Sequence, residues 1–123
     1  MAKMATTKLP ILPNEEIMNR LPKELPKWEL DNEGWIKRIF KTDGWQTTLM
    51  VVNTVAFLAE AAWHHPDMYV TWAKVSVKLK THNVGGITEK DFALAKKIDE
   101  VIGWMPGEDS VLDGNPKREK WVS

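Results

Sequence analysis

Hydrophobic residues recur at helical spacing between residues 43 and 63, which predicts the longest helix of the chain. One apolar stripe of this segment consists of Trp45, Leu49, Val52, Ala56, Ala59 and Trp63. A second stripe beside it consists of Val51, Val55, Leu58 and Ala62. A helix that is apolar nearly all round needs burial on more than one side, whereas the sheet of a small domain covers only one. We therefore expect a second subunit to cover the second stripe.

Alternation of apolar and polar residues predicts strands on both sides of this helix. Between residues 74 and 80 the apolar positions Val75, Val77 and Leu79 alternate with polar ones, which is typical of a strand with one buried face. We expect the segment 69–81 to form a hairpin with its turn near Ala73 and Lys74. Residues 28–41 predict a second hairpin around Asn32-Glu33-Gly34.

The ends of the helices carry their own signals. Asn14 is a plausible N-cap of a short first helix that Pro22 should end, and Asp43 with Gln46 resembles a capping box at the start of the long helix. Thr88 and Asp91 have the same spacing at the start of a last helix, which should end at Gly103. Its inward face is expected to hold Phe92, Ala95, Ile98 and Ile102.

The resulting order is helix, two strands, helix, two strands, helix. It predicts an α+β fold: a four-stranded antiparallel sheet with about three helices packed on one face. We expect residues 1–26 to form a lead-in with the short helix, residues 27–103 the main domain, and residues 104–123 an extended or mobile C-terminal tail.

Composition excludes several classes of protein. The 123 residues contain no cysteine, which removes disulfides, thiolate nucleophiles and cysteine-ligated zinc. Lysine plus arginine equals aspartate plus glutamate, at 17 each, so direct nucleic-acid binding is not expected. The most apolar window, residues 49–62, is shorter than a membrane span, and no export signal is visible, so we expect a cytoplasmic protein without membrane contact.

All three histidines lie between residues 64 and 82. An imidazole with an ordinary pKa of roughly 6.5 suits proton transfer near neutral pH. With a hairpin turn near Ala73-Lys74, paired residue numbers sum to 146 or 147, so His65 would face Thr81 or His82. The sequence therefore predicts a compact imidazole cluster of His64, His65 and His82 at one end of the sheet.

Other interpretations of these residues remain open. His64 and His65 could simply form a corner before Pro66, with His82 ending a strand. A three-histidine zinc site is disfavoured because adjacent side chains diverge and the usual ligand spacing is missing, so no metal is expected. Glycine patterns that bind phosphate are absent, and the strand lysines 74, 78 and 80 more often prevent aggregation than bind anions.

Three motifs together resemble one known family. They are Glu60-Ala61-Ala62-Trp63-His64-His65-Pro66, then Thr81-His82, then Gly86-Ile87-Thr88-Glu89-Lys90-Asp91. Over residues 11–103 the chain resembles pterin-4a-carbinolamine dehydratase, whose fold is known in animals as the dimerisation cofactor of a homeodomain transcription factor. The resemblance implies an enzyme that removes water from a 4a-hydroxytetrahydropterin to give the quinonoid dihydropterin.

The resemblance also implies residue roles. Residues matching His64 and His82 would exchange protons with the pterin, and the one matching His65 would mainly bind it. The substrate-binding set would be Glu60, Trp63, Lys80, Thr81, Asn83 and Asp91. Neither metal nor organic cofactor is implied. The expected partners are the pterin and further copies of the chain, in a homodimer or homotetramer. The alternative is a non-catalytic member that stabilises another protein complex.

Overall fold

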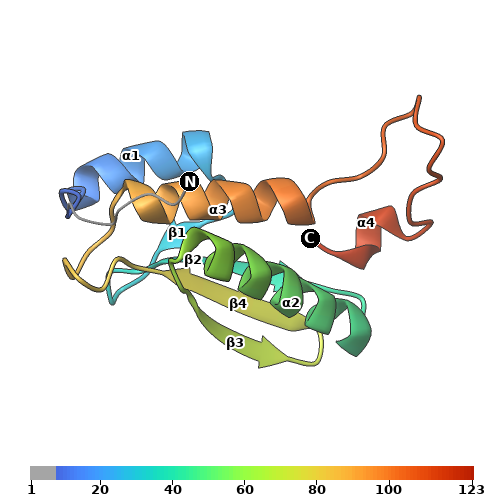
Figure 1. The fold of residues 1–123 in the computed structure, drawn as a ribbon, viewed down its shortest axis with the longest axis horizontal. Helices are drawn as coiled ribbons and strands as arrows, with labels where there is room; N and C mark the ends of the chain where they lie inside the picture. The colour runs from blue at the N-terminus through green and yellow to red at the C-terminus, as the bar shows by residue number, and fades with distance from the viewer. Residues whose placement is uncertain (1–7) are drawn as a thin grey trace.

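The computed structural model describes residues 8–123 and contains a four-stranded sheet with helices on one side (Figure 1). Its elements in chain order are α1 (Asn14–Glu24), β1 (Glu29–Leu30), β2 (Ile36–Lys41), α2 (Trp45–Ala62), β3 (Asp67–Thr71), β4 (Lys74–Leu79), α3 (Glu89–Ile102) and α4 (Arg118–Trp121). The strand order is β1-β2-β4-β3, and every neighbouring pair is antiparallel. The predicted α+β class is confirmed.

The core lies between one face of the sheet and the helices. The buried side chains of the two central strands are Ile36, Arg38, Phe40, Val75, Val77 and Leu79. The register places Ile36 opposite Leu79 and Phe40 opposite Val75, so these side chains share one face. The predicted alternation of β4 is thus confirmed, and its lysines lie on the other face.

Helices α1 and α3 run side by side over the sheet (Figure 1). Arg20 of α1 donates hydrogen bonds to Glu89, and Lys96 of α3 donates one to Glu24. The prediction that Pro22 ends α1 is wrong, because the helix continues to Glu24. Proline removes only one N–H donor there, and Arg20 Nε, 2.6 Å from a Glu24 carboxylate oxygen, holds the last turn together.

The observed starts of α1 and α2 also differ from the predicted ones. Pro13, not Asn14, is the N-cap of α1, and Gly44, not Asp43, is the N-cap of α2. Neither of these N-cap residues has a side chain that accepts a hydrogen bond from the first turn of its helix. Asp43 instead accepts a hydrogen bond from the Thr47 hydroxyl, so the predicted capping box at Asp43 is absent.

The two apolar stripes of α2 do not divide between the core and a second subunit as expected. Val51 and Val55 are buried in the core of the protomer, with Val55 fully inaccessible, so the prediction that they contact a second subunit is wrong. The large apolar residues exposed on α2 are Trp45, Leu49, Met50 and Phe57. Periodicity identifies both stripes but does not show which of them faces the sheet. No helix within residues 8–123, not even the 18-residue α2, combines the length and hydrophobicity of a transmembrane segment.

The C-terminal segment folds back onto the domain. The backbone amides of Lys41 and Ser123 each donate a hydrogen bond to the other residue's carbonyl, and Lys117 donates one to Asp43 at 2.7 Å. A cavity of about 160 Å³ lies between α2, the end of α3 and this segment. Residues that line it include Met50, Val101, Trp104 and Trp121. The end of the tail is therefore packed rather than freely extended.

The ion pairs of Glu24, with Arg20 in α1 and Lys96 in α3, should make the stability of the fold depend on pH. Hydrogen bonds from Arg20 and then Lys96 lower the pKa of Glu24 from 4.5 to about 2. A lowered carboxyl pKa stabilises the fold above pH 4.5, and this contribution disappears as the pH falls towards 2. Arg20→Met should therefore reduce the free energy of unfolding by about 1 kcal/mol at pH 7, and by less at pH 3. Urea denaturation at both pH values measures this. An equal reduction at both would contradict the assignment.

Candidate active site

A sharp corner follows α2 and separates the two adjacent histidines. Trp63, the residue after the helix, adopts a left-handed conformation with φ of 53°, which costs a non-glycine residue about 1 kcal/mol. The amide of His64 then donates to the carbonyl of Ala59. The His64 side chain becomes mostly buried, with 13% of it exposed, whereas 52% of the His65 side chain is exposed.

The first turn of α3 supplies a buried carboxylate. Thr88 is the N-cap, and its hydroxyl accepts a hydrogen bond from the amide of Lys90. Asp91 completes the capping box, as the sequence predicts, because its carboxylate accepts a hydrogen bond of 2.9 Å from the backbone amide of Thr88. The side chain of Asp91 is fully buried. A buried carboxylate requires donors for its oxygens, and the neighbouring elements provide them.

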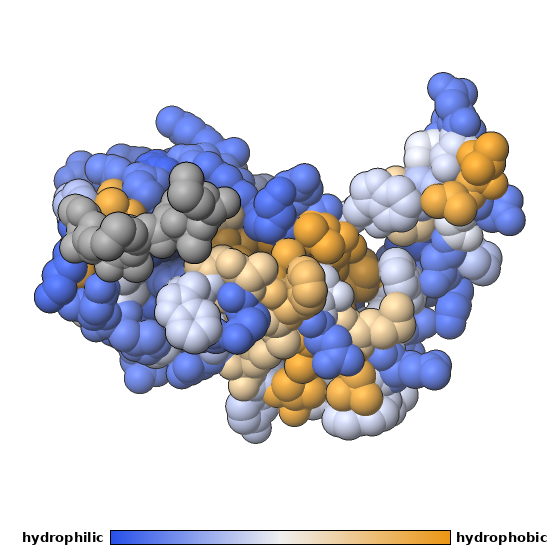
Figure 2. All heavy atoms as spheres, viewed as in Figure 1, coloured by the Kyte–Doolittle hydropathy of each residue, from blue (hydrophilic) through white to orange (hydrophobic). Residues whose placement is uncertain are grey.

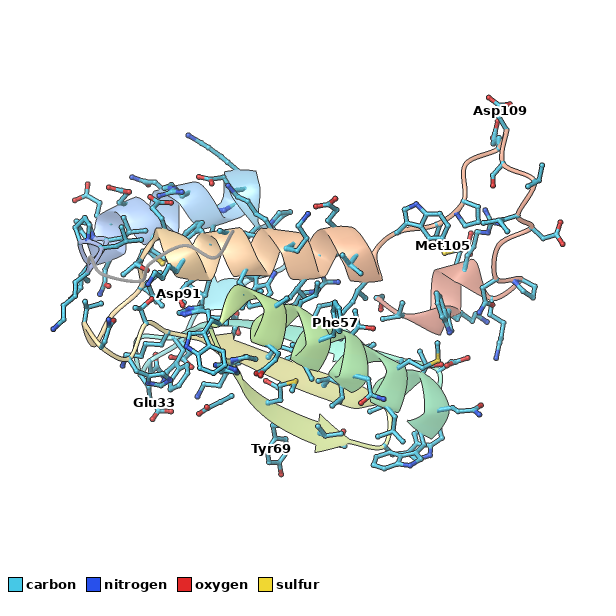
Figure 3. The ribbon with its side chains drawn as sticks, in the orientation of Figure 1. Glu33, Phe57, Tyr69, Asp91, Met105 and Asp109 are labelled. Carbon is cyan, nitrogen blue, oxygen red and sulfur yellow. The ribbon has the colours of Figure 1, made fainter. Side chains whose placement is uncertain are left out.

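Asp91 connects the corner after α2 to the end of β4. One carboxylate oxygen lies 2.6 Å from Nε2 of His64. The other oxygen accepts two hydrogen bonds, one of 2.7 Å from the Thr81 hydroxyl and one from the backbone amide of Thr88. Asp91 lies at the start of α3 (Figure 3), so its hydrogen bonds bring His64 and Thr81 together at this end of the helix.

The direction of each hydrogen bond in this network follows from counting protons. Thr81 gives its single hydroxyl proton to Asp91, so the Thr88 hydroxyl, 2.8 Å away, must donate to Thr81. An ionised carboxylate only accepts, so Nε2 of His64 must carry the proton that it shares with Asp91. Nδ1 is then the nitrogen of His64 that can take up or release a proton. This is the arrangement of a positioned acid–base imidazole.

His65 lies on the solvent side of the same corner. Its Nε2 is 2.9 Å from a carboxylate oxygen of Glu60, one turn back on α2. The Trp63 ring meets the His65 ring edge to face, with centroids 5.2 Å apart. Trp63, Glu60 and His65 thus form an exposed group with aromatic surface and a carboxylate.

His82 follows Thr81 in the turn after β4 and is exposed, as is Asn83. The Trp35 ring meets the His82 ring at 5.3 Å between centroids, with planes inclined at 73°. Lys80 donates from Nζ to the carbonyl of Glu33, in the turn before Trp35. Sequence reasoning did not identify Trp35. No local pattern links it to His82: Ile36 pairs with Leu79, so the residues just before β2 and just after β4 lie at the same end of the sheet.

The predicted register of the β3–β4 hairpin is wrong. Its turn is Trp72-Ala73, and Thr71 pairs with Lys74, so paired numbers sum to 145. The ladder begins at Asp67 opposite Lys78, and His65 lies outside it. The turn lacks glycine, asparagine and proline, so local chemistry did not locate it. Asp91, rather than strand pairing, connects the His64 corner to the end of β4.

Comparison with known proteins agrees with this geometry. The family model described as pterin 4 alpha carbinolamine dehydratase matches residues 10–101. The chain belongs to this dehydratase family. A provisionally named pterin-4-alpha-carbinolamine dehydratase of Aquifex aeolicus is 52% identical over 93 residues, covering 70% of this chain and 94% of the relative. One from Chloroflexus aurantiacus is 45% identical over 95 residues, covering 77% of this chain and all of the relative.

A solved structure supports both the fold and the family. The transcriptional coactivator/pterin dehydratase of Brucella melitensis superimposes with a TM-score of 0.68 at 31% identity. The superposition covers 75% of this chain and 98% of that one. The family match ends at residue 101, so the C-terminal segment that packs against α2 lies beyond it.

Proposed function

We propose that this chain dehydrates a 4a-hydroxytetrahydropterin to the quinonoid dihydropterin. An acid protonates the C4a hydroxyl, the carbon–oxygen bond breaks and water leaves, while a base takes the N5 proton. The observation that carries the proposal is the pairing of His64 Nε2 with the buried Asp91, because it leaves Nδ1 to exchange protons. Membership of the dehydratase family supports the substrate class.

The proposed roles of the histidines are those that the family resemblance implies. His64 and His82 exchange protons with the pterin, and His65 binds its ring with Glu60 and Trp63. Lys80 and Asn83 line the adjacent turn.

The buried residues of the site act differently. Asp91 and Thr81 are 0% and 5% exposed, so we assign them to positioning His64 from behind rather than to substrate contact. This differs from the substrate-binding role that the sequence resemblance implied for both residues.

A turnover assay tests the proposal directly. A synthetic 4a-hydroxytetrahydropterin loses water at an appreciable uncatalysed rate, so the quantity to measure is the acceleration on adding the protein. We expect acceleration that saturates with substrate. A rate equal to the uncatalysed one, with protein shown to be folded by circular dichroism, would exclude the enzymatic function.

A non-catalytic assembly role is the second candidate. It is favoured by the name of the Brucella structure, which includes transcriptional coactivator, and by the apolar residues exposed on α2. Stabilisation of another protein's oligomer would need such a surface but would not need the histidines. Folded protein without turnover would support this candidate.

We also propose that the chain assembles into a homodimer or homotetramer. Figure 2 shows hydrophobic side chains gathered over the face on which α2 lies. Phe57 is 73% exposed and Met50 52%. Covering such side chains contributes about 25 cal/mol for each Å² of apolar surface removed from water, which favours association.

Phe57→Glu should weaken this assembly at least tenfold, because it places a charge in the proposed interface. Met18→Glu makes the same apolar-to-charged change at an exposed residue of α1, away from α2, so it is the matched control and should have little effect. Sedimentation at several concentrations measures both. Val55→Glu is unsuitable because Val55 belongs to the protomer core and the variant should unfold. A parent protein that is a stable monomer at micromolar concentration would overturn the proposal.

A further inference from the structure

The indole of Trp35 lies beside His82 at the end of the β1–β2 turn. It meets the imidazole in an edge-to-face contact, with 5.3 Å between centroids. Trp35 is partly buried and comes immediately before β2, so its backbone is continuous with a central strand. The ring is therefore carried by a rigid part of the fold.

Hydrogen bonds hold the turn that carries Trp35 in one conformation. One carboxylate oxygen of Asp31 accepts the amides of Glu33 at 2.9 Å and Trp35 at 3.0 Å. The amide of Asp31 donates to the carbonyl of Trp35 at 2.8 Å, and Gly34 provides the positive φ of 82° that the turn requires. Burial raises the pKa of Asp31, but these amides and then Lys78 outweigh it, so the net pKa is lowered.

Two lysines of the neighbouring strand tie this turn to the site. Lys78 Nζ lies 3.4 Å from a carboxylate oxygen of Asp31, and Lys80 Nζ donates to the carbonyl of Glu33 at 3.3 Å. The same two ammonium groups lie 4.9 Å and 5.6 Å from the centre of the Trp35 ring. Contacts of a cation with an indole ring contribute about 0.5–1 kcal/mol at exposed positions. The indole is thus held on the side of the hairpin that faces His82.

The three histidines differ in the contacts that hold their rings in place. His64 is hydrogen-bonded to Asp91 and His65 to Glu60. Over residues 8–123, the structure gives the His82 imidazole no hydrogen bond, and its aromatic contact is with Trp35. An aromatic contact restricts a ring without engaging either nitrogen. Both nitrogens of His82 therefore stay free for proton transfer, whereas one nitrogen of His64 is committed to Asp91.

We propose that Trp35 is a positioning residue of the active site, which orders the His82 ring for proton transfer while leaving both of its nitrogens free. This inference rests on the proposed dehydratase function. Since the contact acts on the geometry of a proton-transfer group, its loss should lower kcat more than it changes KM. The shape of an aromatic ring, rather than the indole N–H, supplies the contact.

The test compares Trp35→Ala, Trp35→Phe and Trp72→Ala in the full chain. Trp35→Ala should lower kcat about tenfold to a hundredfold with little change in KM. Trp35→Phe should recover most of the loss, because phenylalanine keeps an aromatic ring at the same position. Trp72, 67% exposed in the β3–β4 turn at the other end of β4, is the matched control and should leave kcat unchanged. Unchanged kcat in folded Trp35→Ala, or a rise in KM alone, would overturn the proposal.

A spectroscopic measurement separates this proposal from the dehydratase function. The indole shifts the NMR signals of the His82 ring protons, and His82→Gln identifies those signals. Trp35→Ala should remove the shift and broaden or average the signals, whereas Trp72→Ala should leave them unchanged. If the parent shows no turnover but the His82 signals respond, the dehydratase function fails and the ordering by Trp35 stands. His82 signals that do not respond to Trp35→Ala overturn the proposal whatever the turnover.

Discussion

Asp91→Asn should lower kcat by about a thousandfold to ten-thousandfold while the domain remains folded. The expected loss follows from the hydrogen-bond directions around Asp91. One side-chain oxygen at this position accepts both the Thr81 hydroxyl and the Thr88 amide, so an asparagine must place its carbonyl there. Its amide group then points at His64. An amide nitrogen donates, so Nε2 of His64 must become the acceptor.

The substitution therefore moves the imidazole proton from Nε2 to Nδ1. The neutral His64 ring would present a proton where the parent presents a lone pair, and the acid–base role would fail without any large change of shape. Nitrogen-15 NMR of labelled histidine distinguishes the two tautomers, and steady-state kinetics on a 4a-hydroxytetrahydropterin gives kcat.

Asp67→Asn is the matched control for this prediction. Asp67 is an exposed carboxylate three residues after His64, so its loss removes the same charge near the site without altering the network. It should retain parent kcat. A folded Asp91→Asn protein with unchanged tautomer and near-parent kcat would show that the buried carboxylate does not position His64.

His64→Ala and His82→Ala should each lower kcat by about a hundredfold to ten-thousandfold, because each removes one proposed proton-transfer group. The double variant should fall by less than the product of the two losses if one imidazole partly replaces the other. His65→Ala should act mainly through KM, since His65 is exposed beside Glu60 and Trp63 and is proposed to bind the ring.

The measurement is the rate of dehydration above the uncatalysed background, with circular dichroism to show that each variant is folded. His65→Ala serves as the internal control, because it removes an imidazole from the same corner. If His82→Ala retains parent kcat, the proposed division of roles is wrong although the family assignment stands. Loss of kcat in His65→Ala alone would assign proton transfer to the exposed corner instead.

Local sequence patterns determined most of the secondary structure. The alternation at Val75, Val77 and Leu79 predicted β4 and its buried face, because neighbouring residues of a strand point to opposite sides. Thr88 and Asp91 predicted the start of α3, since the N-terminal amides of a helix need nearby acceptors. These signals involve residues a few positions apart, so the chemistry that they report is present in the sequence itself.

The candidate site was only partly accessible from sequence. The positions of His64, His65 and His82 in the sequence identified them as a candidate imidazole cluster, and the family resemblance added Asp91 as a substrate-binding residue. Neither showed that Asp91 is buried behind His64, which follows from packing α3 against the corner after α2.

Only the tertiary structure decided how these elements meet. The turn at Trp72-Ala73 lacks turn residues, so local chemistry does not specify the register of the hairpin. Which stripe of α2 faces the sheet, and the contact between Trp35 and His82, depend on tertiary packing. Residues 35 and 82 share no local pattern. Their contact exists because antiparallel pairing of β2 with β4 brings two distant segments to one end of the sheet, and pairing between distant strands depends on the packing of the whole domain.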